Sequence, residues 1–332
     1  MIGLIARRLL LLPLILLVIY TITITLAWAI PGNPLDKPQG RRPPAQVQEA
    51  MKRQYNLDRF DRFYFSYLDS ALGIRWLRAH LTGAAAQASG PSAPRLAIFD
   101  LGPSLQYEDR RVNEIIAGTL PVSVTLGLAA ILIALVIGVA AGVIGAVRPN
   151  SLLDHLSLAV ALIGISLPSF VIGTVLVLIF PVWLGWGSIG GWGGAARPGQ
   201  IILPAFTLSL PFAAYIARLT RMGMLANLRA DYIRTARAKG LSEARVLLRH
   251  ALKNAFLPVL SFLGPACALA MTGSFVVERV FSIPGIGSFF VNAVLNKDLF
   301  LIMGVVLVFA TMLILFNLAV DVLYRWVDPR IE

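Results

Sequence analysis

Charged residues, cysteine and histidine are all scarce in this 332-residue chain. Charged residues make up 14% of the sequence, against roughly 25% in soluble domains. A single cysteine, Cys267, excludes an internal disulfide and a cysteine-rich metal site, and its apolar surroundings favour packing as a small hydrophobic side chain. The three histidines, His80, His155 and His250, are far apart in the sequence. We therefore predict no metal site.

The sequence also lacks the motifs of the common catalytic sites. It has no Gly-x-x-x-x-Gly-Lys-Ser/Thr phosphate loop, no His-Glu-x-x-His and no Gly-x-Ser-x-Gly. We predict no catalytic residue and no cofactor, and without the phosphate loop we do not expect this chain to hydrolyse ATP by that route. A membrane-embedded enzyme remains an alternative, but it needs a catalytic cluster that the sequence does not show.

Ionisable residues are nearly absent from the apolar runs as well. Asp321, near the end of the last run, is the exception, and its spacing from Arg325 favours a residue at the membrane interface. A secondary transporter usually keeps ionisable groups at mid-membrane or is built from repeated halves. That class remains an alternative, although the sequence shows neither feature. A protein with a pathway but no energy source of its own has to take energy from a partner.

What the sequence does contain is six long apolar runs. Hydrophobic residues make up 57% of the chain and the mean hydropathy is +0.76, which predicts an all-α integral membrane protein with six transmembrane helices. Ala27-Trp28-Ala29 resembles a signal-peptidase site, but the first run exceeds the ~7–15 residues of a signal-peptide core, which favours a retained helix. The runs cover residues 9–30, 115–147, 156–183, 201–217, 255–277 and 299–320.

Prolines interrupt several of these runs. We expect Pro121 to separate a short leading segment from the second span, and Pro204 and Pro211 to make the fourth span short and interrupted. Prolines at membrane depth require neighbouring helices or a water-lined cavity to satisfy the freed carbonyls, which predicts a packed bundle around a pathway. The Gly138-x-x-x-Gly142 spacing is expected to let two helices approach closely.

Residues 31–114 form a polar segment between the first two runs. Val47, Met51 and Tyr55 fall on one face of a predicted helix, and the aromatic stretch 60–67 predicts a second amphipathic helix. Residues 83–94 are rich in Gly, Ala, Ser and Pro and predict a flexible insertion. The expected organisation is an N-terminal transmembrane helix (1–30), an extracytoplasmic loop region (31–114) and a five-helix core (115–332).

The basic residues set the predicted orientation. With both termini in the cytoplasm, fourteen Lys and Arg residues lie inside and three lie in the short outer loops, an asymmetry that membrane insertion favours. The same asymmetry accounts for the net charge of +12, and no basic face with stacking aromatics indicates nucleic acid. We therefore predict contact with membrane lipid and no nucleic-acid partner.

Nine of the basic residues lie between positions 218 and 253, against only Asp231 and Glu243. Asp231 is placed to N-cap a helix of about nine residues, and Gly240 to end it in a left-handed conformation, with Leu241 making the following hydrophobic contact. Ser242 is then placed to N-cap a second helix with Glu243 in its first turn. A short capped helix of this kind, at about 231–240, predicts a contact with another protein.

This stretch resembles the cytoplasmic motif of permease subunits of ABC-type importers. The segment DYIRTARAKGLS, followed by RHALKNAFLPV, is similar to the dipeptide and oligopeptide branch, specifically to the B-type permease. Arg234-Thr235-Ala236 and then Gly240 follow the family's Glu-Ala-Ala, three residues, Gly pattern, with the Glu and first Ala replaced. Supporting segments are the N-terminal Arg-Arg with its Leu-rich span, Ile30-Pro-Gly-Asn-Pro34, 99–104, 273–287 and Asp328-Pro-Arg330.

The resemblance implies a bundle like that of a type I ABC importer permease, with the capped helix as its coupling helix. Small residues would let a partner's groove approach, and basic residues would pair with acidic groups on that partner. The alternative is a solvated basic loop that only follows the charge asymmetry. His250 is interpreted as a structural helix histidine. The implied coupling residues are Asp231, Arg234, Thr235, Ala236, Arg237, Ala238, Lys239, Gly240 and Leu241.

The resemblance also implies the partners: two ATP-binding subunits, a homologous sister permease and an extracytoplasmic peptide-binding protein. It implies a multi-pass protein of the bacterial cytoplasmic (inner) membrane that forms half of a translocation pathway for peptides. The alternative cargo is another solute delivered by a binding protein, such as a nickel chelate, because no substrate-binding residue can be assigned. The implied outer gate and docking residues are Asp100, Gly102, Ser104, Phe281, Pro284, Gly285 and Gly287.

Overall fold

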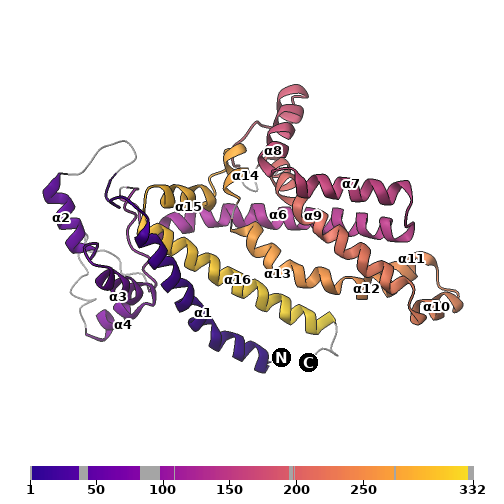
Figure 1. Ribbon diagram of the computed structural model, residues 1–332, viewed down its shortest axis with the longest axis horizontal. Helices are drawn as coiled ribbons and strands as arrows, with labels where there is room; N and C mark the ends of the chain where they lie inside the picture. Colours follow the sequence, from indigo (N-terminus) through magenta and orange to yellow (C-terminus); the bar gives the residue numbers. More distant parts are fainter. Residues whose placement is uncertain are drawn as a thin grey trace. The chain divides into compact units, whose positions relative to one another are not determined.

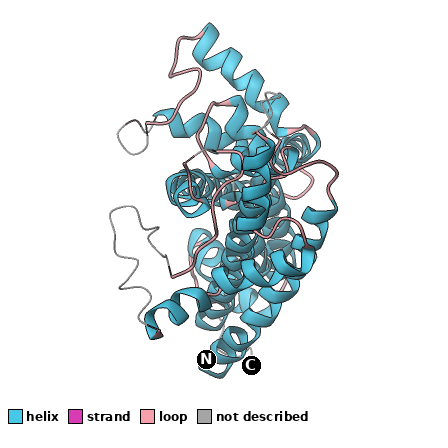
Figure 2. Ribbon diagram, turned by 90° about the vertical axis from the view of Figure 1, so that its left-hand side faces the viewer, coloured by secondary structure: helices cyan, strands magenta, loops and turns pink. Residues whose placement is uncertain are grey.

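The computed structural model describes residues 2–36, 44–82, 98–107, 109–193, 197, 199–272 and 274–327, and these ranges are helical with no strand longer than one bridge. Figures 1 and 2 show the helices and their connections. The predicted flexible insertion at 83–94 and the closing segment 328–330 lie outside the described residues. The α-helices are α1 (Ile2–Ala29), α2 (Ala45–Gln54), α3 (Phe60–Ala71), α4 (Ile74–Leu81), α6 (Val112–Val147), α7 (Leu152–Ser166), α8 (Ser169–Val177), α9 (Gly199–Leu228), α10 (Asp231–Ala238), α11 (Glu243–Arg245), α12 (Leu252–Ala255), α13 (Leu257–Met271), α14 (Phe275–Val280), α15 (Ile286–Leu295) and α16 (Leu299–Val327).

Four of these helices are long and apolar enough to cross a membrane: Leu10–Ala29, Val112–Val147, Gly199–Leu228 and Leu299–Arg325. Two further pairs meet the same test as bent spans, Leu152–Ser166 with Ser169–Trp183 and Glu243–Ala255 with Leu257–Met271, at angles of 105° and 57°. Within the described residues, the spans number six if each bent pair is counted once. The prediction of an all-helical membrane protein is confirmed.

Proline explains the break between α7 and α8. Leu167 has an extended backbone (ψ 131°), which is the conformation that a following proline imposes, and Pro168 then stands at the N-cap of α8. A π-helical turn, Leu178–Trp183, completes this bent span around Pro181. The second bent span likewise has a π-helical turn, Val246–Ala251, before its break near Pro258.

Two predicted interruptions are wrong. The fourth span is not short, because α9 runs unbroken for 30 residues through Pro204 and Pro211. Pro121 likewise lies inside α6 and separates nothing. A proline removes one backbone donor but does not end a helix whose two faces are held by neighbours, and α9 packs against α7, α12 and α13. As a result, Arg218 and Arg221 belong to a helix and not to a loop.

The Gly138-x-x-x-Gly142 spacing does bring two helices together, as predicted. A Cβ atom at Gly138 would lie 2.7 Å from the Ala213 carbonyl oxygen, and one at Gly142 would lie 2.5 Å from the Thr220 side chain. Real Cβ atoms do not approach other atoms this closely, so α6 and α9 pack backbone against backbone along this face.

The chain forms two compact units. Unit 1 comprises Met1–Leu11, Leu120–Ser288 and Thr311–Glu332, and unit 2 comprises Leu12–Thr119 and Phe289–Ala310. Unit 2 contains both helices predicted for the polar segment, with Phe63 and Tyr67 of α3 buried. Tyr20 of α1 is also buried there and donates a hydrogen bond to the Tyr64 carbonyl at 2.5 Å. The part of α1 after Leu11 is therefore part of the folded core of unit 2.

Candidate functional site

Helix α10 begins one residue earlier than predicted. Ala230, with an extended backbone, holds the N-cap position, so Asp231 is the first helical residue and the prediction that it caps the helix is wrong. Alanine has no side-chain acceptor, so α10 has no side-chain cap at this end. Asp231 instead stands in the first turn, where the helix dipole favours a negative charge, with Arg234 Nη1 3.3 Å from its carboxylate.

The other end of α10 follows the prediction. Gly240 has φ +78°, and its N–H donates to the Arg237 carbonyl at 2.9 Å. The Leu241 N–H donates to the Ala236 carbonyl at 3.4 Å, which completes a Schellman motif. Leu241 packs against the buried cluster that contains Ala236. A Cβ atom at Gly240 would meet nothing within 4 Å, so this glycine is required by its backbone conformation and not by crowding.

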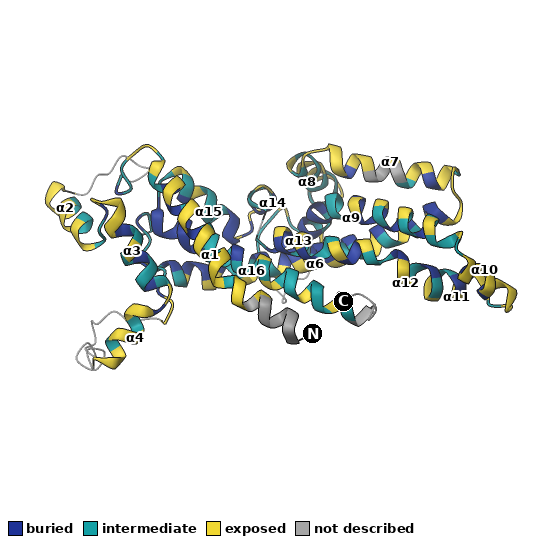
Figure 3. Ribbon diagram, turned by 60° about the horizontal axis from the view of Figure 1, so that its bottom comes forward, coloured by how far each residue is buried: buried dark blue, intermediate teal, exposed yellow. Residues whose placement is uncertain are grey.

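Helix α10 has one buried and one exposed face (Figure 3). Ile233 and Ala236, three residues apart and so on one face, are buried. The expectation that Ala236 offers a small surface to a partner is therefore wrong. Exposed side chains on the same helix and its cap are Asp231, Tyr232, Arg234, Thr235, Arg237, Ala238 and Lys239. The cluster around the buried face consists of Ala146, Met224, Val246, Ala251 and Ala255.

An ion pair joins α10 to α11. The Arg237 guanidinium donates to both Glu243 carboxylate oxygens, at 2.8 and 3.2 Å, and these hydrogen bonds raise the pKa of Arg237. Ser242 stands at the N-cap of α11 as predicted, but its side chain makes no capping hydrogen bond. Lys239 has no ion-pair partner among the described residues, so it is the basic residue of α10 and its cap left free for another protein.

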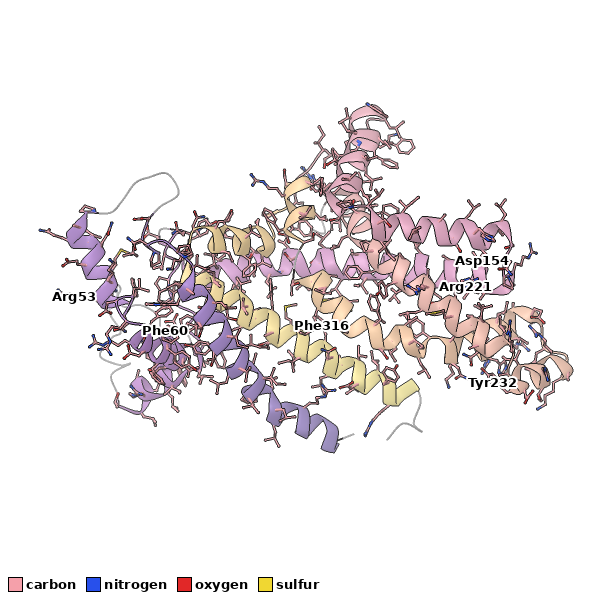
Figure 4. The ribbon with its side chains drawn as sticks, in the orientation of Figure 1. Arg53, Phe60, Asp154, Arg221, Tyr232 and Phe316 are labelled. Carbon is pink, nitrogen blue, oxygen red and sulfur yellow. The ribbon has the colours of Figure 1, made fainter. Side chains whose placement is uncertain are left out.

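A polar network that the sequence did not indicate ties the same segment to its neighbours. The Tyr232 hydroxyl donates to Asn227 Oδ1 at 2.5 Å and accepts from Asn254 Nδ2 at 3.1 Å. These residues belong to α10, α9 and α12 (Tyr232 is labelled in Figure 4). His250 lies half-buried in the π-helical turn before α12. Helix α10 is thus held to the body of unit 1 by both apolar and polar contacts.

The predicted outer residues of unit 2 are mostly internal. Asp100 is buried, pairs with Arg111 at 2.5 Å and accepts from the Gly102 N–H at 2.9 Å. Gly102 is buried with φ +84°, and a Cβ there would overlap the Phe300 ring. The expectation that these two residues form a docking surface is therefore wrong, because they are occupied in shaping the chain before α6.

Ser104, half-buried, donates its hydroxyl to a carboxylate that sequence reasoning missed. That carboxylate belongs to Asp298, which is fully buried and also accepts from the backbone of Leu105, Gln106 and Leu301. Burial raises the pKa of Asp298. An aspartate directly before an apolar helix is an N-cap signal, and this position could have been found on that ground.

The predicted outer residues of unit 1 surround a second buried carboxyl group. Glu278 is fully buried and accepts from the Ser123 hydroxyl at 2.7 Å and the Ser288 N–H at 3.2 Å. A Cβ at Gly285 would overlap this carboxyl group, and one at Gly287 would lie 3.0 Å from it. These two glycines make room for Glu278 and do not form a docking surface. Phe281 is also buried, which leaves Pro284 as the exposed member of this predicted set.

Glu278 makes the stability of the protein depend on pH. Burial raises the pKa of Glu278 above its ordinary value of 4.5, so the folded state holds this proton more tightly than the unfolded state. The resulting stabilisation is complete below pH 4.5 and is lost as the pH rises through the folded-state pKa.

We expect the difference in stability between Glu278→Gln and the parent to favour the variant more at about pH 8 than at about pH 4. Glutamine does not ionise, so the variant does not lose this stabilisation as the pH rises. The measurement is the thermal unfolding midpoint of the detergent-solubilised protein across this range. Glu49→Gln, on an exposed position of α2, is the control and should show no such trend. A difference between Glu278→Gln and the parent that stays constant with pH would contradict the expectation.

Two further ion pairs join described helices of unit 1, and neither was predicted. The guanidinium of Arg221 in α9 donates to both carboxylate oxygens of Asp154 in α7, at 2.6 and 2.7 Å (Figure 4). Asp154 is 1% exposed and also accepts from the Asn150 N–H. Asp321, expected beside Arg325, pairs instead with Arg8 of α1 at 2.7 Å. A sequence does not show which distant helices will be neighbours.

The chain matches a family described as "Binding-protein-dependent transport system inner membrane component" over residues 134–332. The oligopeptide transport system permease protein OppB of Haemophilus influenzae is 38% identical over 96% of this chain and 95% of its own length. OppB of Escherichia coli K12 is 40% identical over 96% of this chain and 95% of its own length. The dipeptide transport system permease protein DppB of Bacillus subtilis is 38% identical over 96% of this chain and 94% of its own length.

Among solved structures, a chain of the inward-facing MetNI methionine ABC transporter is similar at 18% identity and a TM-score of 0.48, covering 65% of this chain and 97% of its own. The resemblance to permease subunits is confirmed by the curated relatives at 38–40% identity, which are permeases and not enzymes. This chain therefore belongs to the family of inner membrane components of binding-protein-dependent transport systems, as a multi-pass membrane permease.

Proposed function

We propose that this chain forms half of the translocation pathway of an ATP-driven peptide importer, together with a homologous sister permease. Two ATP-binding subunits supply the energy, and an extracytoplasmic binding protein delivers the peptide. The peptide cargo is supported by relatives named for oligopeptide and dipeptide transport. The observation that carries the proposal is the exposed, basic face of α10, which projects from a buried anchor and offers a small docking helix.

The anchor of α10 suggests how a movement of the ATP-binding subunits reaches the membrane. Ile233 and Ala236 lie in a cluster with Ala146 of α6, Met224 of α9 and Ala255 of α12. A displacement of α10 therefore acts on three helices together. ATP binding that favours one position of α10 would shift the bundle between inward-facing and outward-facing states, since a ligand shifts an equilibrium by binding one state more tightly.

The test is uptake by proteoliposomes that contain the chain with its sister permease and ATP-binding subunits. We expect labelled short peptides to accumulate only when ATP and the loaded binding protein are both present. Liposomes without this chain are the control. Accumulation of a nickel chelate without any peptide would contradict the peptide cargo, and peptide uptake driven by an ion gradient without ATP would contradict the coupling.

The proposed orientation places both termini and α10 in the cytoplasm and residues 31–114 outside, as the charge asymmetry favours. We expect an impermeant thiol reagent to label Gln54→Cys but not Ser242→Cys in intact cells, and both after lysis. Both positions are exposed, and the background is Cys267→Ala because Cys267 is a free cysteine. Labelling of Ser242→Cys in intact cells would reverse the orientation.

A further inference from the structure

A cavity of about 310 Å³ opens within unit 2. The transport proposal does not explain the function of this cavity. This volume lies at the lower end of the roughly 300–1,000 Å³ of small-ligand sites. Its walls come from the end of α2, α3, α4, the segment before α6 and the start of α16. The aromatic and charged side chains that line the cavity include Tyr55, Tyr67, Arg75, Asp100, Arg111 and Phe300.

The charges in the cavity leave an excess of one positive charge. Asp100 is satisfied, because Arg111 pairs with one carboxylate oxygen and the Gly102 N–H donates to the other. The Nε atom of Arg111 is buried and has no hydrogen-bond partner. Arg75 of α4 is exposed on the wall and has no ion-pair partner among the described residues. Because the Asp100–Arg111 pair is neutral, Arg75 leaves the cavity with one net positive charge. One positive charge suits a monoanion such as a carboxylate better than a phosphate dianion.

Next to these charges the wall is aromatic. The Tyr55 and Phe300 rings meet edge to face with centroids 5.7 Å apart, and Tyr67 packs on Phe300 at the same distance. The Tyr67 hydroxyl is buried without a hydrogen-bond partner among the described residues, so it is a donor available to a ligand. Gln54 and Asn56 add side-chain amides to the wall. This combination of apolar rings with a few polar groups is the usual composition of a ligand site.

We propose that this cavity binds the C-terminal carboxylate of a short peptide. The guanidinium groups of Arg75 and Arg111 hold the carboxylate, the Tyr55 and Phe300 rings contact the last side chain, and the amides of Gln54 and Asn56 face the peptide backbone. This assignment rests on the proposed peptide cargo and orientation. It gives unit 2 the role of binding the C-terminus of the peptide before the peptide is translocated. Arginine is suited to this role because its planar fork matches a carboxylate.

The experiment measures binding of N-acetyl-Ala-Phe, and of the same dipeptide with a C-terminal amide, to the full-length chain in nanodiscs by calorimetry. We expect saturable binding of the free acid and none of the amide. Arg75→Gln should weaken binding at least about tenfold, since it removes a charge-assisted hydrogen bond. Arg78→Gln is the matched control: Arg78 lies on the same helix, pairs with Asp69 and does not line the cavity. Arg75 is exposed and has no ion-pair partner among the described residues, and Arg78 is 69% exposed in its pair with Asp69, so both substitutions should leave the unfolding midpoint close to that of the parent.

Three results would overturn the assignment: no saturable binding of the free acid, equal binding of the amide, or equal losses in Arg75→Gln and Arg78→Gln. Inorganic phosphate that competes as well as the peptide would also overturn it in favour of a phosphate site. Failure here is distinguishable from failure of the proposed function. ATP-driven peptide uptake by the parent chain without saturable carboxylate binding refutes the cavity alone, and carboxylate binding without ATP-driven uptake refutes the importer alone.

Discussion

Ala238→Trp is expected to abolish ATP-driven peptide uptake while the membrane core stays folded. Ala238 is exposed at the last turn of α10, beside the unpaired Lys239. An indole group there would hold a docking partner away from the helix, and it would not disturb the buried cluster around Ile233. The measurements are peptide uptake and stimulation of ATP hydrolysis by the loaded binding protein in proteoliposomes, with the unfolding midpoint recorded in detergent. Both activities should fall to background, and the midpoint should match that of the parent.

The control for this prediction is the same substitution two residues earlier. Ala236 is 6% exposed, so a tryptophan there overfills a packed cluster, at a cost of roughly 1–3 kcal/mol or more. Ala236→Trp should therefore lose stability and uptake together, whereas Ala238→Trp should lose uptake alone. Ala238→Ser, which keeps the side chain small, should remain active. Full uptake and stimulation in Ala238→Trp would refute the docking role of α10.

Asp154→Ala is expected to lower the stability of the protein more than an alanine substitution of any other ion-paired carboxylate residue in unit 1. Its carboxylate is 2% exposed and receives two hydrogen bonds from Arg221, whose side chain is 22% exposed. Removing one member of such a buried pair leaves the other charge without compensation, which costs about 3–5 kcal/mol. The measurement is the equilibrium free energy of unfolding in mixed micelles of increasing SDS content.

Two variants make this prediction sharper. Asp321→Ala removes a second inter-helix pair of unit 1, with Arg8, but the side chains of that pair are 49% and 28% exposed, so the loss should be about 0–1 kcal/mol. The double variant Asp154→Leu with Arg221→Met should be more stable than Asp154→Ala, because no unpaired charge remains. Equal losses in Asp154→Ala and Asp321→Ala would contradict the importance assigned to the buried pair.

The features that the sequence predicted well are those that depend on neighbouring residues. Six apolar runs predicted the helices and spans, and Gly240 with Leu241 predicted the Schellman end of α10, because a left-handed position followed by an apolar residue is a local requirement. The Gly138-x-x-x-Gly142 spacing predicted a close approach of helices, although it did not identify α9 as the partner. Each of these signals lies within a few residues of the feature it describes.

The errors concern neighbours that are distant in sequence. The sequence predicts breaks at Pro204 and Pro211, but packing on both faces of α9 keeps it continuous. It also predicts that small residues such as Ala236, Gly285 and Gly287 form contact surfaces for partners, but they are small because buried groups occupy the adjacent space. Composition does not distinguish a residue that is small to admit a partner from one that is small to fit a core.

The separation of the two faces of α10 has a consequence for partner choice. The residues that anchor the helix, Ile233 and Ala236, are different from those that a partner can reach, Arg234, Ala238 and Lys239 among them. The exposed set can therefore change while the anchor and the membrane bundle stay as they are. A permease of this design can acquire a different ATP-binding subunit through a few surface substitutions. An exchange of those exposed residues between two related permeases should exchange the ATP-binding subunit that each permease binds.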